Sequence, residues 1–273
     1  MMTTASRYTI FKTFAICVVI SACGNGTPTA FQSAWHDCPD RRWIGPDFWA
    51  NRLQDWWLRD GRLEATTPRP MRTAHLVTRQ LIDRTGNIEV SAHFGPLQQT
   101  DSDSGRSSAG VLIGAGRGLD YRAAALIHHS YGPSAGLYVG VDTDGRLFVR
   151  DIEQEDPIVT MTETRRGPVD SVALHVSAQP LGDSYEIVVR AVLWNAGRDT
   201  IRLTTGGIPE DRLVGNVALV SDTRSEAQLR FWFSNWSVSG TKIERFDERR
   251  AGPVLGTQHT LTRGTLKLTA QLM

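Results

Sequence analysis

The sequence predicts an all-β domain built as a two-sheet antiparallel β-sandwich. From Arg72 onward, apolar and polar residues alternate in short segments, the period expected of strands with one buried face. Turn residues separate these segments, and no long segment has a helical period. A parallel α/β fold needs crossover helices, so it is excluded. Without the N-terminal signal described below, the length is about 250 residues and suits one domain, since all-β sandwiches often run to that size.

Each expected strand is a short alternating or apolar segment with turn residues at its ends. The segment Asp142-Thr143-Asp144-Gly145 predicts a tight hairpin, because Asp-Gly suits a turn that needs positive φ. In chain order, the expected strands cover residues 73–81, 87–94, 109–114, 121–127, 136–141, 146–150, 171–178, 185–193, 200–204, 217–221 and 229–238.

The N-terminus has the features of a secretory signal. Arg7 and Lys12 precede a short apolar run at 14–20 and small residues, after which Cys23 follows. The run is too short to span a bilayer, which needs about 20 apolar residues. The pattern resembles a bacterial lipoprotein signal, which implies cleavage before Cys23 and acylation of its thiol. Gly24 replaces the aspartate that often retains such proteins at the inner membrane, so the outer membrane is favoured. An ordinary signal peptide with a chance cysteine is the alternative.

Four segments are expected: a lipoprotein signal at 1–22, a flexible tether at 23–40, the sandwich at 41–245 and a C-terminal extension at 246–273. Gly, Pro and Thr are frequent in the tether, so it buries too little apolar surface to order itself. Cys17 leaves with the signal and Cys23 carries lipid, which leaves Cys38 without an intramolecular partner. A buried thiol is favoured over an intermolecular bridge.

The net charge argues against a nucleic-acid partner. The full chain carries a formal charge of +1, and removal of Arg7 and Lys12 with the signal leaves −1. Nucleic-acid-binding proteins present a strongly basic surface, and a mature chain near neutrality has no general footprint of that kind.

Two motifs carry a family resemblance. An early hairpin at residues 56–64 reads Trp-Trp-Leu-Arg-Asp-Gly-Arg-Leu-Glu, and closing strands contain Gly215-Asn216-Val217 and Phe233-Ser234-Asn235-Trp236-Ser237-Val238-Ser239-Gly240. Together they resemble the concanavalin A-like lectin/glucanase superfold, nearest to bacterial laminin G-like and 3-keto-disaccharide hydrolase-like jelly rolls. The resemblance covers about Trp43 to Gly240. It implies the fold and leaves the activity open.

A second resemblance concerns the tail. Residues 252–272 are similar to the connecting segment of certain alkaline phosphatase D-type proteins, in which a jelly roll precedes a metallophosphatase domain. The resemblance implies a non-catalytic N-terminal module and leaves open whether a separate phosphatase chain acts with it. No phosphatase metal ligands are carried over, because this sequence has no matching positions.

Tryptophans are the candidate ligand-binding residues, because aromatic faces stack on sugar rings. Trp194, Trp232 and Trp236 lie on expected strands, and the last two share a parity opposite to Phe231 and Phe233. One of these faces is expected to line the concave groove that is the usual ligand surface of this superfold. The N-terminal tryptophans would contact sugar or cap the core, and for Trp56 and Trp57 capping the core is favoured. Trp56 and Trp57 cannot both face inward on one strand. The N-terminal group comprises Trp35, Trp43, Trp49, Trp56 and Trp57.

No catalytic site is recognisable. Glycosidases need two carboxylates flanking the bond, and the laminarinase-like Glu-x-Asp-x-x-Glu pattern does not occur. The acidic run at 153–156 adjoins Pro157 and is typical of a solvated loop. Glu89 and Glu186 are single strand acids that are expected to face solvent. The sequence therefore favours a non-catalytic protein.

No metal or cofactor site is predicted. Residues 101–105 read Asp-Ser-Asp-Ser-Gly but lack the downstream glutamate of a calcium loop, so a flexible polar loop is favoured. His128 and His129 would face opposite sides of a strand. Three further histidines at strand positions lack zinc-ligand spacing. These are His75, His93 and His175.

The leading hypothesis is a lipid-anchored, non-catalytic jelly roll that binds carbohydrate or a protein partner at the cell envelope. A glycan-active enzyme related to the 3-keto-disaccharide hydrolases is the second. An accessory module of a split phosphatase is the third.

Overall fold

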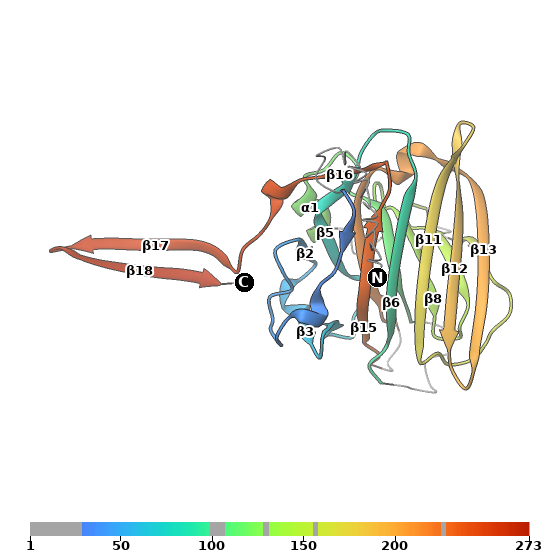
Figure 1. Cartoon of the computed structure of the whole chain (residues 1–273), viewed down its shortest axis with the longest axis horizontal. Helices are drawn as coiled ribbons and strands as arrows, with labels where there is room; N and C mark the ends of the chain where they lie inside the picture. The colour runs from blue at the N-terminus through green and yellow to red at the C-terminus, as the bar shows by residue number, and fades with distance from the viewer. Residues whose placement is uncertain (1–28, 99–106, 128–130, 155–157, 225–227, 273) are drawn as a thin grey trace, which may run out of the picture.

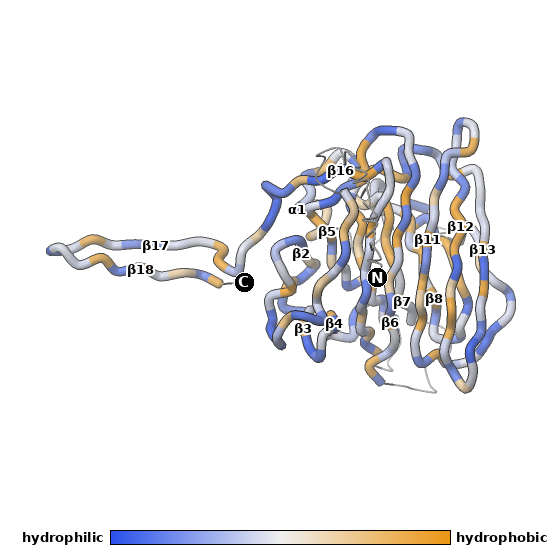
Figure 2. The backbone as a smooth tube through the Cα atoms, viewed as in Figure 1, coloured by the Kyte–Doolittle hydropathy of each residue, from blue (hydrophilic) through white to orange (hydrophobic). Residues whose placement is uncertain are grey.

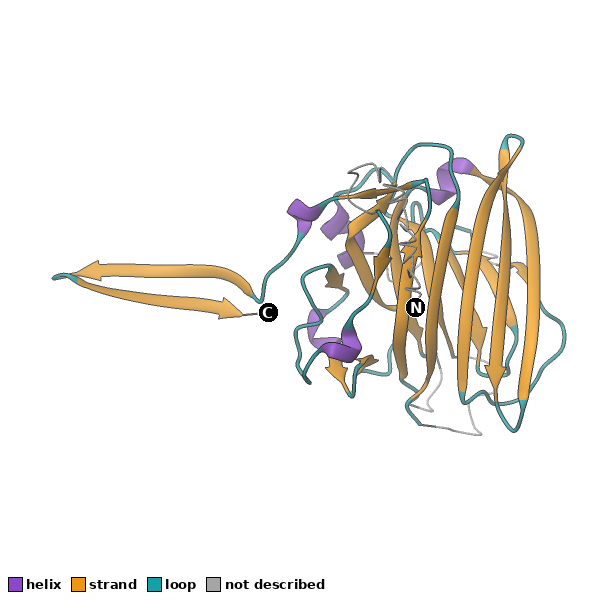
Figure 3. Cartoon of the chain, viewed as in Figure 1, coloured by secondary structure: helices purple, strands orange, loops and turns teal. Residues whose placement is uncertain are grey.

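The computed structural model describes residues 29–98, 107–127, 131–154, 158–224 and 228–272. Strands make up most of this part of the chain, and the helices are short (Figure 3). Two antiparallel sheets lie one behind the other (Figure 1) and share one apolar core. The predicted two-sheet antiparallel sandwich is confirmed.

Sheet A has the strand order β13-β12-β11-β6-β15-β4-β3, with β1 beside β15. Its neighbours are antiparallel, and strands far apart in the sequence lie side by side, as β6 does between β11 and β15. Its strands are β1 (Phe31–Gln32), β3 (Trp56–Arg59), β4 (Arg62–Ala65), β6 (Ile88–Pro96), β11 (Ser171–Leu181), β12 (Ser184–Trp194), β13 (Arg198–Pro209) and β15 (Phe231–Ser239).

Sheet B has the order β10-β9-β8-β7-β14-β5-β16, with β2 beside β5. Its central strands are buried along their whole length, because loops and a short helix cover the face that points away from sheet A. Its strands are β2 (Phe48–Ala50), β5 (Arg72–Leu81), β7 (Ser108–Ala115), β8 (Leu137–Asp142), β9 (Leu147–Asp151), β10 (Ile158–Met161), β14 (Gly215–Asp222) and β16 (Ile243–Arg245).

Sheet A alternates between a buried and a solvent-facing side. In β12, buried Ile187 and Val189 are followed by exposed Arg190, and the same alternation runs through β6 and β11. The hydrophobic residues along these strands are visible in Figure 2. One face of sheet A therefore closes the core, and its outer face is free to carry polar and aromatic side chains.

One expected strand is a helix. Residues 121–127, expected as a strand, form α1 (Tyr121–Ile127), so this prediction is wrong. The Asp120 carboxylate accepts hydrogen bonds from the backbone N–H groups of Arg122 (2.9 Å) and Ala123 (3.3 Å), as an N-cap does. Three alanines then follow, and alanine has the highest helix propensity. Ala124 and Ala125 are buried, so this side of the helix packs against the rest of the domain.

The predicted tether at 23–40 is wrong in its second half. Phe31 pairs with Val238 of β15, and Trp35 is 3% exposed within the core. These two aromatic side chains bury enough apolar surface to fix the segment on the sandwich. The average composition of the tether, rich in Gly, Pro and Thr, does not reveal this. A short 3-10 helix, η1 (Trp35–Asp37), follows.

The signal and the predicted lipidation site Cys23 lie outside the described residues. None of the helices in the described ranges has the length and apolar character required to cross a membrane.

Tight turns close the predicted hairpins. Asp60 and Gly61 both have positive φ (49° and 71°) between β3 and β4. Gly145, at φ 74°, donates its N–H to the Asp142 carbonyl (2.9 Å) between β8 and β9. Asp-Gly pairs tolerate this conformation, as the sequence predicts.

The C-terminal extension contains one further hairpin. After η4 (Asp247–Arg249), strands β17 (Val254–Thr262) and β18 (Thr265–Leu272) pair only with each other. Both are exposed throughout, and the hairpin projects away from the sandwich (Figure 1).

Candidate functional site

Three aromatic side chains meet on the outer face of sheet A. The His93 ring centroid lies 5.1 Å from that of Trp232, with the planes at 81°, and 5.5 Å from that of Trp194, with the planes at 55°. All three are half-buried, so each keeps part of its surface in solvent. We call these residues the aromatic cluster. It contains two of the three tryptophans that the sequence singled out.

Strand register assembles this cluster. His93 on β6 lies opposite Ala173 on β11, and the small alanine leaves room for Trp194 on β12 to reach His93. On the other side, Trp232 on β15 lies opposite Gly95. A Cβ atom at residue 95 would lie 2.4 Å from the Asp170 carbonyl oxygen and 3.0 Å from the Trp232 ring, so glycine leaves room for both.

The surroundings of His93 favour its neutral form. Burial lowers the pKa of His93 below its ordinary value of 6.5. Its Nε2 atom is buried and has no hydrogen-bond partner among the described residues. With a neutral imidazole between two indoles, the centre of the cluster is mainly apolar, and the Nε2 atom of His93 is the polar atom that a ligand could bond.

Guanidinium groups flank both tryptophans. Arg62 lies 5.4 Å from the Trp232 ring centroid and forms an ion pair with Glu64 (2.8 Å). Arg198 lies 5.7 Å from the Trp194 ring centroid. Hydrogen-bond donors and a carboxylate acceptor therefore border the aromatic surface.

A polar hollow lies further along the same face. In it the Glu89 Oε2 and His175 Nε2 atoms lie 3.0 Å apart. Along β6, Glu89 and His93 are four residues apart, about 13 Å at the usual rise per residue. The hollow measures about 310 Å³ and is lined by Glu89, His175, Ser177, Gln179, Glu186, Val188 and Arg190. Glu89 and Glu186 lie on the outer face as expected, and the sequence did not show that they share a hollow.

Trp236 does not belong to this face, and the predicted parity is wrong. Asn235 has a positive φ of 49°, and the register with β6 shifts between Ser234 and Ser237. This bulge adds one residue and reverses the side of the strand on which the next side chain falls. Trp236 is 0% exposed and stacks on Phe48, with centroids 5.7 Å apart. We therefore assign Trp236 to the core.

The N-terminal tryptophans divide between core and surface. Trp35 and Trp56 are buried in the core. Trp57 is half-buried on the other side of β3, which confirms that Trp56 and Trp57 cannot both face inward. Arg42 and Arg59 lie over the Trp57 ring at 4.7 Å and 4.2 Å from its centroid.

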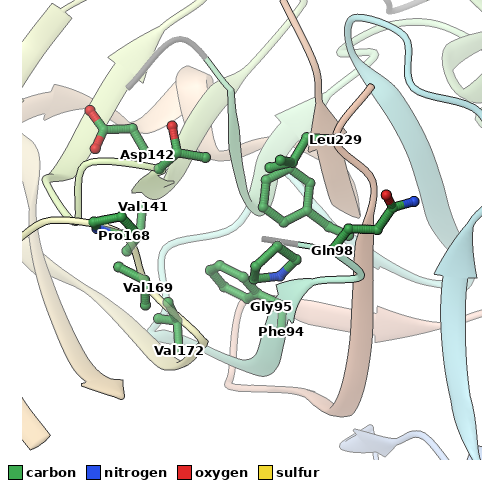
Figure 4. A pocket seen from close by; sticks show the side chains of 12 residues that line it. Phe94, Gly95, Gln98, Val141, Asp142, Pro168, Val169, Val172 and Leu229 are labelled. Atoms are coloured by element: carbon green, nitrogen blue, oxygen red, sulfur yellow. The ribbon is translucent and has the colours of Figure 1, made fainter. Parts of the chain in front are cut away.

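An apolar slot at one end of the sandwich is too small for a sugar ring. Val141 and Val169 lie on one side of it and Leu229 on the other, with Phe94 between them (Figure 4). Its volume of about 30 Å³ would admit one or two water molecules. Asp142 at its rim is held by Arg146 (2.8 Å), although burial raises the pKa of the Asp142 carboxyl.

Other side chains offer little for metal or thiol chemistry. In the described ranges, no group of three or more His, Cys, Asp or Glu side chains could hold a metal ion. The 101–105 loop, His128, His129 and part of the 153–156 run lie outside those ranges. Cys38 is half-buried, and Arg41 donates a hydrogen bond to its sulfur (3.4 Å).

His93 was not predicted as the centre of the cluster. The signal was present, because strict alternation in 87–94 puts His93 on the face of Glu89 and Ser91. What was missing was the order of the strands, which places β6 between the strands that carry the two tryptophans.

No protein-family model and no curated protein matches the chain. Among solved structures, the lectin from Bauhinia forficata in complex with GalNAc is 14% identical with a TM-score of 0.48, covering 78% of this chain and 97% of the lectin. Lectin I from Ulex europaeus, in complex with the methyl glycoside of α-L-fucose, is 11% identical with a TM-score of 0.49, covering 78% and 98%. The carbohydrate recognition domain of Emp46p is 13% identical with a TM-score of 0.44, covering 70% and 86%. Each of these is a likeness of fold.

Proposed function

We propose that the protein is a non-catalytic carbohydrate-binding module and that its ligand lies on the outer face of sheet A. One observation carries the proposal: Trp194 and Trp232, from distant parts of the sequence, present half-buried rings on either side of His93. Indole faces stack on the apolar faces of sugar rings, and a sheet holds them rigidly.

The surroundings of the cluster suit a polyhydroxylated ligand. Arg62 and Glu64 supply donors and acceptors beside Trp232. The His93 Nε2 atom, which has no hydrogen-bond partner in the described part of the chain, is ready to bond with a sugar hydroxyl. The polar hollow extends the surface along the strands. Stacking on the cluster and hydrogen bonds in the hollow would together hold an oligosaccharide.

The test is a glycan-array screen followed by calorimetric titration of the best binder. Trp232→Ala and Trp194→Ala should each weaken binding by about tenfold, because each removes one stacking platform. Trp49→Ala is the matched control, since Trp49 is half-buried on sheet B. Saturable binding that neither variant weakens would remove this face as the site. Capture of a protein partner with no glycan binding would replace carbohydrate with protein as the ligand.

The same proposal places the module at the cell envelope, held at the outer membrane by acyl chains on Cys23. The support is the order of basic residues, apolar run and small residues before this cysteine. Two or more acyl chains anchor a protein stably, whereas one chain does so marginally. Labelled palmitate should enter the full chain and not Cys23→Ala. Equal labelling of both proteins, or of neither, would contradict the anchor.

Glycan cleavage is the second candidate, and the shared hollow of Glu89 and Glu186 favours testing it. Glycoside hydrolysis uses a pair of carboxyl groups across the scissile bond. Incubation with 3-keto-glycosides would give turnover that Glu89→Gln and Glu186→Gln each abolish. Binding without turnover supports the non-catalytic module.

A further inference from the structure

Two arginines face each other across neighbouring strands on the outer face of sheet A. The register places Arg190 of β12 directly opposite Arg202 of β13. On its other side, Arg190 lies opposite His175 of β11. Directly opposed residues have Cβ atoms about 4.5–5.5 Å apart and point to the same side of the sheet. We call Arg190 and Arg202 the cationic row.

No carboxylate in the described ranges neutralises the two guanidinium groups. Arg190 and Arg202 are exposed, and neither forms an ion pair or side-chain hydrogen bond with a described residue. Other arginines of this protein do find partners: Arg146 pairs with Asp142, and Arg212 with Asp151. Like charges directly opposite each other destabilise a sheet.

The nearest acidic side chains are engaged or distant. Glu89 Oε2 lies beside His175 Nε2 (3.0 Å), and Asp199 of β13 is paired with Arg166. Glu186 lies on the same side of β12 as Arg190 but four residues away, about 13 Å along the strand. The two guanidinium groups are therefore free to take an anion from solution.

The cationic row adjoins the proposed carbohydrate site. Arg190 lines the polar hollow, and Trp194 lies four residues further along β12, again about 13 Å away. A further guanidinium, that of Arg198, stands over Trp194. A monosaccharide cannot reach both Trp194 and the row, whereas an oligosaccharide can.

We propose that the ligand is an acidic oligosaccharide, with an anionic group of one sugar seated between Arg190 and Arg202 while another sugar stacks on the aromatic cluster. This inference rests on the proposed carbohydrate-binding function. Guanidinium groups bind planar carboxylates through paired, charge-assisted hydrogen bonds, so a uronate is the first class to test. A sulfate ester offers the same negative oxygens and is the second.

The test uses matched ligands and the full chain. Calorimetry compares an oligouronate with its methyl ester, which has the same rings and no charge, and with a sulfated oligosaccharide of equal length. The acid should bind at least about tenfold more tightly than the ester at low salt. Added salt should reduce this advantage, because exposed charges are screened. Which acid binds more tightly, the uronate or the sulfate ester, identifies the anionic group.

Arg190→Gln and Arg202→Gln should each weaken binding of the acid by about tenfold and leave binding of the ester unchanged. Arg263→Gln is the control, because Arg263 is an exposed arginine in the turn of the C-terminal hairpin. A structural readout accompanies binding: Arg202→Gln should raise the melting temperature of the free protein, since it removes the repulsion across β12 and β13.

Four results would overturn the proposal, and one of them also removes the function on which it rests. Equal binding of acid and ester, both lost in Trp232→Ala, leaves a carbohydrate site without a charge preference. Unchanged acid binding in both arginine variants puts the anion elsewhere. Equally tight binding of single-stranded DNA makes the face a general anion surface. Absence of binding by acid, sulfated and neutral oligosaccharides removes the carbohydrate function as well.

Discussion

The Trp232 indole stands edge-on to the His93 imidazole, with ring centroids 5.1 Å apart and planes at 81°. This contact joins β15 to β6 on the solvent side of sheet A, directly above Phe233 and Phe94, which meet in the core on the other side. The sheet that closes the core therefore also fixes the candidate site. A substitution on the inner face should mainly change stability, and a substitution on the outer face should mainly change ligand binding.

Trp236 and Trp232 should behave differently when truncated, although they are four residues apart. Trp236→Ala is expected to lower the free energy of unfolding by about 3–5 kcal/mol, because a fully buried indole is lost from the core. Trp232→Ala should cost less, since its ring is half-buried. Urea unfolding of both variants measures the difference. Equal costs would contradict the inward turn that Asn235 produces.

His93 should make stability depend on pH. Burial lowers its pKa in the folded protein, so between that value and about 6.5 the unfolded chain binds the proton and the native protein does not. Stability therefore rises with pH across this window and falls on acidification. In His93→Gln the fall between about pH 7 and about pH 5.5 should shrink. His259→Gln is the control, because His259 is exposed on β17.

Lys242 is a fully buried lysine whose ammonium group ties three segments together. It donates to the Arg84 carbonyl (2.8 Å) and to Glu210 Oε1 (3.0 Å). Lys242→Met removes both bonds while keeping an apolar chain, and it should cost about 1–3 kcal/mol of stability in urea unfolding. Lys267→Met, on exposed β18, should cost nothing measurable.

The same variant should change the acid limb of the stability curve. The hydrogen bond from Lys242 lowers the pKa of Glu210 below its ordinary value of 4.5. A carboxyl with a lowered pKa stabilises the fold above its unfolded value, and this contribution is lost as pH falls through the folded value. Without Lys242 that acid-dependent loss should be smaller. An unchanged acid limb would show that the pair does not form.

Removal of the C-terminal hairpin should leave the sandwich intact. All described residues of β17 and β18 are exposed, so the hairpin buries almost no apolar surface against the rest of the chain. A chain ending at Gly252 keeps the Ala251 N–H bond to the Pro46 carbonyl (2.9 Å) and should melt at the same temperature as the full chain. A clear drop in the melting temperature would show that the hairpin packs on the sandwich.

Most strands were predictable because their signal is local. Alternation in 185–193 and the Asp-Gly turns at 60–61 and 142–145 depend on neighbouring residues, and the structure follows them. The helix at 121–127 was missed because a short, mostly apolar run between turn residues fits a strand as well as a helix by its pattern. The alanine propensity and the capping role of Asp120 favour the helix.

The sequence by itself determined that this chain forms antiparallel strands with one apolar and one polar side, since period-two alternation can be recognised within a single segment. Only the tertiary structure decided which side chains meet. A single left-handed residue, Asn235, turned Trp236 inward, and strand order brought Trp194 to His93. Register then set Arg190 against Arg202. Such pairings depend on the register between separate strands, because a register shift of one residue moves every side chain of a strand to the opposite face of the sheet.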